Sequence, residues 1–350
     1  MNHKEIISKH DLIFETAPDI WQNGSPIGNG HFGAMVYQPE NSIEFAVAKL
    51  DVWDRRAEMP PQIPFSKIRE IIKDNPEKLT PALQVEFPSE NSIMPGPKPC
   101  GNLNISADKS FIDLTVFSRE QKLDLGKAVC SGTYEVSSKQ MGFESFVDPI
   151  HNLLAVKMED LWTDRKLNCS YVQEVVLARE IDYQLGLPVL SYDNGISYVR
   201  YSFPDGFEYV MAMLVDSAEC ASPEIYPEYV KIKVKLDYSK KRKNSYCVYL
   251  AVATSMDSAD PFRSVTRILN DAKAEGFSSI KKRHLAWWSE FWEKSAVEFG
   301  NKFLEGIWYF SLYQFASSSR GDIAPGLFGL WNASKTPPWS GDCPTNQIMI

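Results

Sequence analysis

The segment Val230-Lys-Ile-Lys-Val-Lys-Leu236 decides the fold class, because its apolar residues and lysines alternate strictly. Successive side chains of a β-strand point to opposite faces, so this alternation is typical of a strand with one buried and one wet face. Similar short runs, rich in β-branched and aromatic residues, recur from Phe14 to about Ser258: 43–48, 111–117, 153–158, 196–202, 207–215 and 246–253. We therefore predict a large antiparallel β-domain over 1–259.

The spacing of apolar residues changes after Asp260-Pro261. An amphipathic helix with proline near its first turn is predicted there, because four apolar residues share one helical face: Val265, Ile268, Leu269 and Ala272. Two further helices are predicted over 278–296 and 303–319, and a short one over 64–73. The fold class is therefore α+β multidomain, with a β-domain over 1–259, a helical linker over 260–300 and a further helical part over 301–350.

Three tryptophans of the second predicted helix repeat at helical spacing, namely Trp287, Trp288 and Trp292. Exposed indoles can form a platform for sugars, but indoles at this spacing are more often packed against a neighbouring element. We interpret them as core between the domains.

Composition excludes several classes of protein. The chain has 350 residues, of which 44% are apolar, so it can form well-filled cores and is not intrinsically disordered. Its 37 basic and 45 acidic residues give a net charge of -8, which favours neither a nucleic acid nor an anionic membrane as partner. The one basic cluster, Lys240-Lys-Arg-Lys243, is predicted to be a solvated hairpin turn. The longest apolar run, 209–215, is far below the ~20 residues of a membrane-spanning helix.

Cysteine and histidine usage predicts no metal site and no cofactor. The six cysteines form no C-x-x-C pair, and only five histidines accompany them. We predict free, mostly buried thiols. The N-terminus lacks the basic and apolar regions of a secretory signal, so we expect a cytoplasmic protein.

The segment Gly28-Asn-Gly30-His-Phe-Gly33 matches the dinucleotide-binding pattern G-x-G-x-x-G, and Asp51 and Asp54 follow about 20 residues later. A dinucleotide site needs a helix directly after the glycines, whose N-terminus holds the pyrophosphate. Residues 34–37 predict a strand instead, so we exclude this site and attribute the glycines to positive φ angles.

A glycine loop followed by Val47-Ala-Lys49 also imitates the start of a protein kinase. Phosphoryl transfer in that class needs an H-R-D loop and a D-F-G aspartate, and neither triplet follows in the sequence. We therefore predict that Lys49 is an ordinary strand lysine. The segment Trp53-Asp-Arg-Arg56 predicts a buried structural ion pair.

Several motifs are spread over almost the whole chain: Ser25-Pro-Ile-Gly-Asn-Gly30, Gly33-Ala-Met-Val36, Leu50-Asp-Val-Trp-Asp-Arg-Arg56, Pro99-Cys-Gly-Asn-Leu-Asn-Ile105, Arg119 to Leu125, Gly326-Leu-Phe-Gly-Leu-Trp-Asn332 and Pro337-Pro-Trp-Ser340. Together, and in this order, they resemble glycoside hydrolase family 95, the α-L-fucosidase group. The resemblance implies an N-terminal β-supersandwich, a helical linker and the first part of a catalytic (α/α)6 toroid.

In that family the toroid's cleft hydrolyses a terminal α-linked sugar with inversion, using an acid and a base ~6.5–9.5 Å apart. The family's acid and base lie beyond the loop with which this sequence ends. The resemblance therefore implies a fragment, inactive alone, whose partners are an oligosaccharide or glycoside substrate and the missing C-terminal part of the same polypeptide. The alternative is a non-catalytic carbohydrate-binding or scaffolding β-module whose helical tail docks on another chain.

By resemblance, Asn346 matches the first water-positioning asparagine of the family's H-x-N-x-N motif. Pro344 and Ile348 occupy the positions of its histidine and second asparagine, although a shift of one residue would place Gln347 at the second. A neutral side-chain carbonyl can orient and polarise a water, which suits a catalytic amide. The alternative is a loop asparagine that satisfies backbone groups.

Five further residues are candidate substrate-binding groups, each with a structural alternative. Trp331 and Trp339 lie on a loop and either stack on sugar CH groups or pack. Asp342 either bonds a sugar hydroxyl or caps a helix. Asn29 and His31 either reach the cleft from the sandwich side or serve only the turn.

Overall fold

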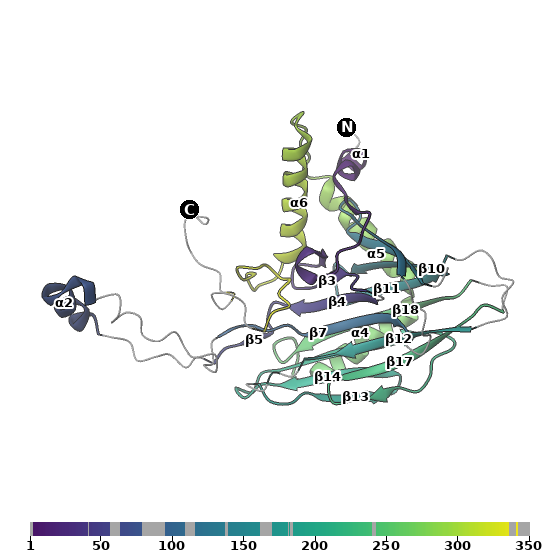
Figure 1. Ribbon diagram of the computed structural model, residues 1–350, viewed down its shortest axis with the longest axis horizontal. Helices are drawn as coiled ribbons and strands as arrows, with labels where there is room; N and C mark the ends of the chain where they lie inside the picture. Colours follow the sequence, from purple (N-terminus) through teal and green to yellow (C-terminus); the bar gives the residue numbers. More distant parts are fainter. Residues whose placement is uncertain are drawn as a thin grey trace.

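The computed structural model describes eleven stretches of the chain: 3–40, 42–56, 64–78, 95–108, 116–136, 139–161, 170–180, 182, 185–239, 243–335 and 341. Within them, two large antiparallel sheets form a β-sandwich, and three helices follow it (Figure 1). The predicted antiparallel β-domain and the change from strands to helices near residue 260 are therefore confirmed.

The larger sheet has nine strands among the described residues, in the spatial order β1-β8-β9-β10-β11-β18-β15-β14-β13. Their bounds are β1 (Leu12–Phe14), β8 (Val116–Asp124), β9 (Val129–Val136), β10 (Lys139–Val147), β11 (Leu153–Asp160), β13 (Val189–Asp193), β14 (Ile196–Ser202), β15 (Glu208–Asp216) and β18 (Ser245–Thr254). Every neighbouring pair is antiparallel.

The second sheet has seven described strands, in the order β16-β17-β12-β7-β4-β3-β2. Their bounds are β2 (Ser25–Gly28), β3 (Phe32–Tyr37), β4 (Ser42–Lys49), β7 (Gly101–Ala107), β12 (Ser170–Ala178), β16 (Glu224–Ile225) and β17 (Tyr229–Asp237). A separate pair joins β5 (Trp53–Asp54) to β6 (Gly96–Pro97).

Strand β17 shows why the alternating segment forms a half-wet strand. Its four apolar residues are buried: Val230, Ile232, Val234 and Leu236. On the opposite face Lys231 and Lys233 lie 3.0 and 3.8 Å from the carboxylate of Glu174 on β12. The predicted period of two is therefore confirmed residue by residue.

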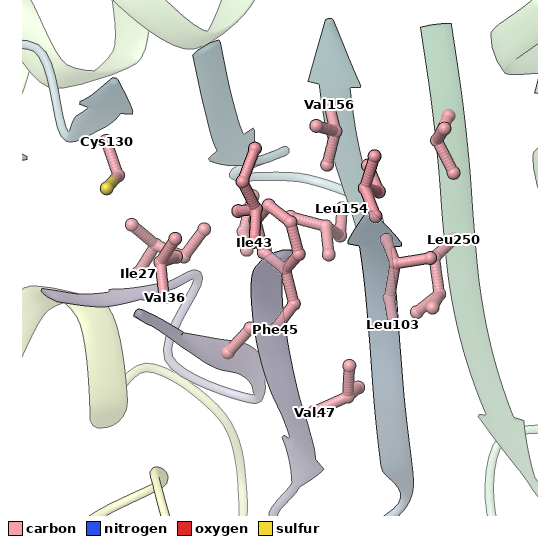
Figure 2. Packing of buried hydrophobic residues seen from close by; sticks show 14 of the residues in the cluster. Ile27, Val36, Ile43, Phe45, Val47, Leu103, Cys130, Leu154, Val156 and Leu250 are labelled. Atoms are coloured by element: carbon pink, nitrogen blue, oxygen red, sulfur yellow. The ribbon is translucent and has the colours of Figure 1, made fainter. Parts of the chain in front are cut away.

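The main core lies between the two sheets (Figure 2). Residues of the seven-stranded sheet, including Phe45 and Leu103, face residues of the nine-stranded sheet, including Leu154 and Leu250. Burying one such side chain stabilises the fold by about 1.5–3 kcal/mol, so this layer holds the sheets together.

One prediction about connectivity is wrong. The basic cluster was expected in a hairpin turn, and most of it lies outside the described residues. However, β17 and β18, which flank it, belong to different sheets. The chain therefore crosses from one layer to the other there, a choice of strand partners that local alternation does not specify.

The helices among the described residues are α1 (His3–Ile7), α2 (Phe65–Asp74), α4 (Pro261–Glu275), α5 (Phe277–Trp292) and α6 (Lys302–Ser318), with short 3-10 turns at Ser8–His10, Trp21–Asn23 and Pro76–Lys78. The Asp260 side chain caps α4 by accepting a hydrogen bond from the Arg263 backbone N–H at 3.0 Å. Gly276, with φ +79°, ends α4 and precedes α5. All four predicted helices are therefore present. No described helix is both long and apolar enough to cross a membrane.

The tryptophans of α5 pack as predicted. Trp288 and Trp292 are buried in the same core as the sandwich. Their rings lie 5.3 Å from Tyr313 and 5.9 Å from Tyr309 of α6. The indole N–H of Trp292 donates to the carbonyl oxygen of Leu125 at 3.0 Å. Helices α5 and α6 are thus fixed to the sandwich by aromatic packing.

Helix α6 is apolar around most of its circumference. One side contacts the sandwich core through Tyr309 and Tyr313, while the other exposes Phe303, Ile307 and Phe315. In Figure 1 this helix rises from the sandwich beside β3 and extends beyond the sheets. It is the last helix in the described part of the chain, so the toroid and the domain boundaries at 259 and 300 remain predictions.

Candidate functional site

The turn between β2 and β3 brings the glycine-rich motif against the end of α6. The Gly30 backbone N–H donates to the Ser317 carbonyl oxygen at 2.7 Å, and the Arg320 N–H donates back to the Gly30 carbonyl oxygen at 3.3 Å. Gly30 has φ +86°, and an added Cβ would lie 2.6 Å from the Arg320 backbone nitrogen. A hairpin turn and a strand follow the glycines, which agrees with the exclusion of a dinucleotide site.

The other two glycines of the motif correct an expectation. Gly28 and Gly33 do not have positive φ angles. A Cβ on Gly28 would lie 2.5 Å from the Ser317 carbonyl oxygen, and one on Gly33 would lie 2.5 Å from the Ile27 carbonyl oxygen and 2.8 Å from the side chain of Leu330. These glycines are therefore needed for the close approach of α6, of the neighbouring strand β2 and of the segment that follows α6, which only the folded chain reveals.

Asn29 holds this turn together. Its amide oxygen accepts hydrogen bonds from the backbone N–H groups of His31 and Phe32 at 3.1 and 2.9 Å. Its amide nitrogen donates to the carbonyl oxygens of Asp148 and His151 at 3.1 and 2.9 Å. The residue is 7% exposed. Of its two predicted roles, the structure shows the one in the turn; a contact with substrate stays a prediction.

Beside the turn lies a cluster of polar side chains that we call the rim cluster: His31, Lys49, Asp51, Thr254 and Asp257. The Lys49 ammonium donates to the Asp51 carboxylate at 2.6 Å, and it lies 3.0 Å from the Asp257 carboxylate. It also donates to Nε2 of His31 at 2.9 Å. Lys49 lies in strand β4 as predicted, but it is only 2% exposed, so it is a buried lysine and not the solvated one that is usual in a strand.

The rim cluster joins the two sheets. Lys49 ends β4 of the seven-stranded sheet, and Thr254 ends β18 of the nine-stranded sheet. The Thr254 hydroxyl donates to the Asp51 carboxylate at 2.5 Å, and the Thr254 backbone N–H donates to Asp257 at 2.8 Å. A buried charge is tolerated when it is paired and hydrogen-bonded, and these contacts satisfy that condition for Lys49.

The contact with Lys49 sets the protonation of His31. An ammonium can only donate, so Nε2 accepts and the neutral ring carries its proton on Nδ1. Burial, and then the positive charge of Lys49, lower the pKa of His31. Nδ1 is buried without a hydrogen-bond partner among the described residues. His31 is half-buried, so its ring can still meet a ligand at the edge of the cluster.

Three members of the rim cluster have the side chains of a metal site. Ligand atoms of His31, Asp51 and Asp257 lie within 4.8 Å of one another. The Lys49 ammonium contacts all three side chains and so takes the place that a metal cation would occupy among them. The three residues therefore belong to a network centred on Lys49 and do not form a metal site.

Trp331 packs against the seven-stranded sheet. It is 8% exposed, and its indole N–H donates to the Ile27 carbonyl oxygen at 2.9 Å. It shares a small apolar cluster with Met35 and Leu50. Of its two predicted roles, the structure shows packing, since a sugar needs an exposed ring face.

Three predicted site residues, Trp339, Asp342 and Asn346, lie outside the described residues. The predicted ion pair of the early segment is confirmed, because the Arg56 guanidinium lies 2.9 Å from the buried Asp54 carboxylate. Sequence reasoning missed the rim cluster. The available signal was Lys49 itself, a charged residue at the end of the apolar run 45–48 with an acid two residues later.

Comparisons with known proteins identify the kind of chain. A family model described as "Glycosyl hydrolase family 65, N-terminal domain" matches residues 12–258. The curated "Probable alpha-fucosidase A" of Aspergillus niger is 24% identical over an alignment of 398 positions, gaps included, that covers 96% of this chain and 47% of that protein. This chain therefore spans about half the length of the curated relative it matches.

A solved structure titled "Putative kojibiose phosphorylase from human microbiome" superposes with a TM-score of 0.64 at 10% identity, over 97% of this chain and 43% of that one. At this identity the likeness shows the fold alone. The predicted kinship with glycoside hydrolases is confirmed, although the family model that matches is that of family 65 and not family 95. The described strands of the antiparallel sandwich all lie within the matched residues 12–258, and the chain belongs to the glycosyl hydrolase family 65 N-terminal domain family.

Proposed function

We propose that this chain is part of a glycoside hydrolase that resembles the inverting α-L-fucosidases of family 95 and removes a terminal α-linked sugar. In this proposal the sandwich supports a helical catalytic domain of the (α/α)6 type. The rim cluster and the turn at Gly30 form the sandwich side of its cleft.

Helix α6 is the observation that carries the proposal. Its exposed side includes Phe303, which is 74% exposed, together with Leu304, Ile307 and Phe315. A helix that is apolar all round is stable in water only when neighbours cover it. The opposite side of α6 already contacts the sandwich, so the exposed side is suited to further helices of a catalytic domain.

The relatives support the chemistry. One is named as a probable alpha-fucosidase, and the matching family model belongs to the glycosyl hydrolases. By the resemblance of the loop, we propose that Asn346 positions the attacking water, and that Trp339 and Asp342 contact the sugar. We assign the general acid and the general base to no residue of 1–350.

The test compares residues 1–350 with the longest reading frame that contains them, using 4-nitrophenyl α-L-fucoside as substrate. We expect the longer protein to release fucose first as the inverted anomer, seen by proton NMR, and residues 1–350 to release none. In the longer protein, Asn346→Ala should lower kcat by about 100-fold or more, because the water loses its orientation.

Gln347→Ala is the matched control, because it removes the neighbouring amide that a shift of the motif by one residue would bring into the site. It should leave kcat within about threefold of the parent. Turnover by residues 1–350 that is lost in Asn346→Ala would contradict the placement of the acid and base outside this chain. A longer protein that hydrolyses no fucoside would favour the non-catalytic β-module.

A further inference from the structure

The outer face of the nine-stranded sheet is covered by helices over only part of its length. Under α4 and α5 the outward side chains are apolar and buried, among them Val129 of β9, Phe146 of β10 and Leu153 of β11. They pack against Leu269 and Ile280 of the helices. This cover ends near Phe277, the first residue of α5.

Beyond that point the same strands change from apolar to polar. The next outward positions form a row across four strands, in which Lys122, Ser131, Glu144 and Lys157 are direct neighbours. The following row contains Thr133, Gly142 and Glu159. The sequence therefore stops providing an apolar face where the helix cover stops, and provides hydrogen-bonding groups instead.

This polar strip is the floor of a groove of about 640 Å3. Strand β1 forms one wall with Ile13 and Phe14, and the start of α5 forms another with Phe277 and Lys281. Leu161 closes the floor, because its side chain lies over Gly142. Ile13 is 70% exposed, which leaves an apolar edge facing the groove. The volume lies within the range of small-ligand sites.

The three lysines that line the groove are each paired with a carboxylate. Lys281 lies 2.5 Å from Glu144, and Lys122 lies 2.8 Å from Asp11. Lys157 lies 3.5 Å from Glu159. Each lysine of the groove thus has a carboxylate beside it. A strongly charged ligand would break these pairs, whereas a neutral ligand with many hydroxyl groups can donate to the carboxylates and accept from the ammoniums.

We propose that this groove binds a neutral oligosaccharide, at a site separate from the rim cluster. Sugar hydroxyls both donate and accept, which matches the paired charges and the hydroxyl groups of Ser131 and Thr133. The apolar CH groups of the sugar ring match the wall formed by Ile13 and Phe14. The groove holds a glycan chain on the outer face of the sandwich and does no chemistry on it.

The experiment uses residues 1–350 and isothermal titration calorimetry. The probes are neutral trisaccharides (maltotriose, cellotriose, xylotriose, mannotriose and 2′-fucosyllactose), together with anionic tri-galacturonate and cationic chitotriosamine. We expect saturable binding of at least one neutral probe at concentrations up to about 10 mM, and weaker binding of both charged probes.

Ser131→Phe fills the floor of the groove and should weaken that binding by about tenfold or more. The matched control is Ser106→Phe, which places the same ring on the outward face of β7 in the other sheet and should leave affinity unchanged. Circular dichroism and thermal unfolding check that both variants are folded.

Two results overturn the proposal: no neutral probe binds, whether or not a charged probe does, or Ser131→Phe binds the neutral probe as tightly as the parent chain. The proposal for the groove is tested by the binding of trisaccharides, and the proposed hydrolase activity is tested by the turnover of a fucoside. Failure of one is therefore distinguishable from failure of the other.

Discussion

The rim cluster and the outer groove use the same residue types in opposite ways. In the rim cluster, the fully buried Lys49 side chain donates to two carboxylates and a histidine. In the groove, the partly exposed Lys157 lies beside a single carboxylate. Both places pair lysine with acid, yet the first pair is enclosed between the two sheets and the second remains accessible to a ligand. Burial, and not residue type, separates the two roles.

The largest expected effect on stability comes from removing the buried lysine of the rim cluster. Lys49→Met removes the ammonium and leaves Asp51 and Asp257 without their shared partner, so the free energy of unfolding should fall by about 3–5 kcal/mol. Lys157→Met in the groove should cost less than about 1 kcal/mol, because that pair is solvated. Urea unfolding followed by tryptophan fluorescence measures both. Equal losses would show that burial does not set the difference.

A smaller effect is expected at the turn beside the rim cluster. Gly30→Ala introduces a Cβ at φ +86° and 2.6 Å from the Arg320 nitrogen, whereas Gly206→Ala meets φ +88° with no atom within 4 Å. The control should cost about 1 kcal/mol for the φ angle alone. Gly30→Ala should cost about 1–3 kcal/mol more, because α6 must move. Thermal unfolding of the two variants gives the difference, and equal costs would exclude a packing role for Gly30.

The smallest expected effect is the pH dependence of stability that His31 contributes to the rim cluster. The pKa of His31 is lowered by burial and by Lys49, so the unfolded chain binds a proton at a higher pH than the folded chain. The stability from neutral His31 is therefore complete above about pH 6.5 and is lost as the pH falls below that value. His31→Gln should flatten this part of the stability profile. A two-dimensional NMR titration of the ring should find a pKa below 6.5, and a pKa above it would reverse the assignment.

Local patterns predicted the elements of the fold because their causes are local. The alternation over 230–236 specifies a half-wet strand, and the spacing after Asp260 specifies a helix with its cap. Both required only neighbouring residues. The packing of the tryptophans in α5 was predictable for the same reason.

The candidate site was harder to predict because its contacts join distant parts of the sequence. Lys49 and Asp257 are separated by 208 positions, and no local period relates them. The assignment of β17 and β18 to different sheets, and the fit of α6 against Gly28, likewise depend on tertiary packing. The packing of Trp331 likewise joins it to distant residues, since it lies against Met35 and donates to the carbonyl oxygen of Ile27, 304 positions earlier.

The reciprocal hydrogen bonds between Gly30 and the end of α6 limit how that helix can move. Sliding α6 along its axis by one residue, about 1.5 Å, would break both bonds at once. The core packing of Tyr309 and Tyr313 opposes a tilt of the same helix. The sandwich therefore fixes both the axial position and the orientation of α6, and any domain that packs on this helix inherits that placement.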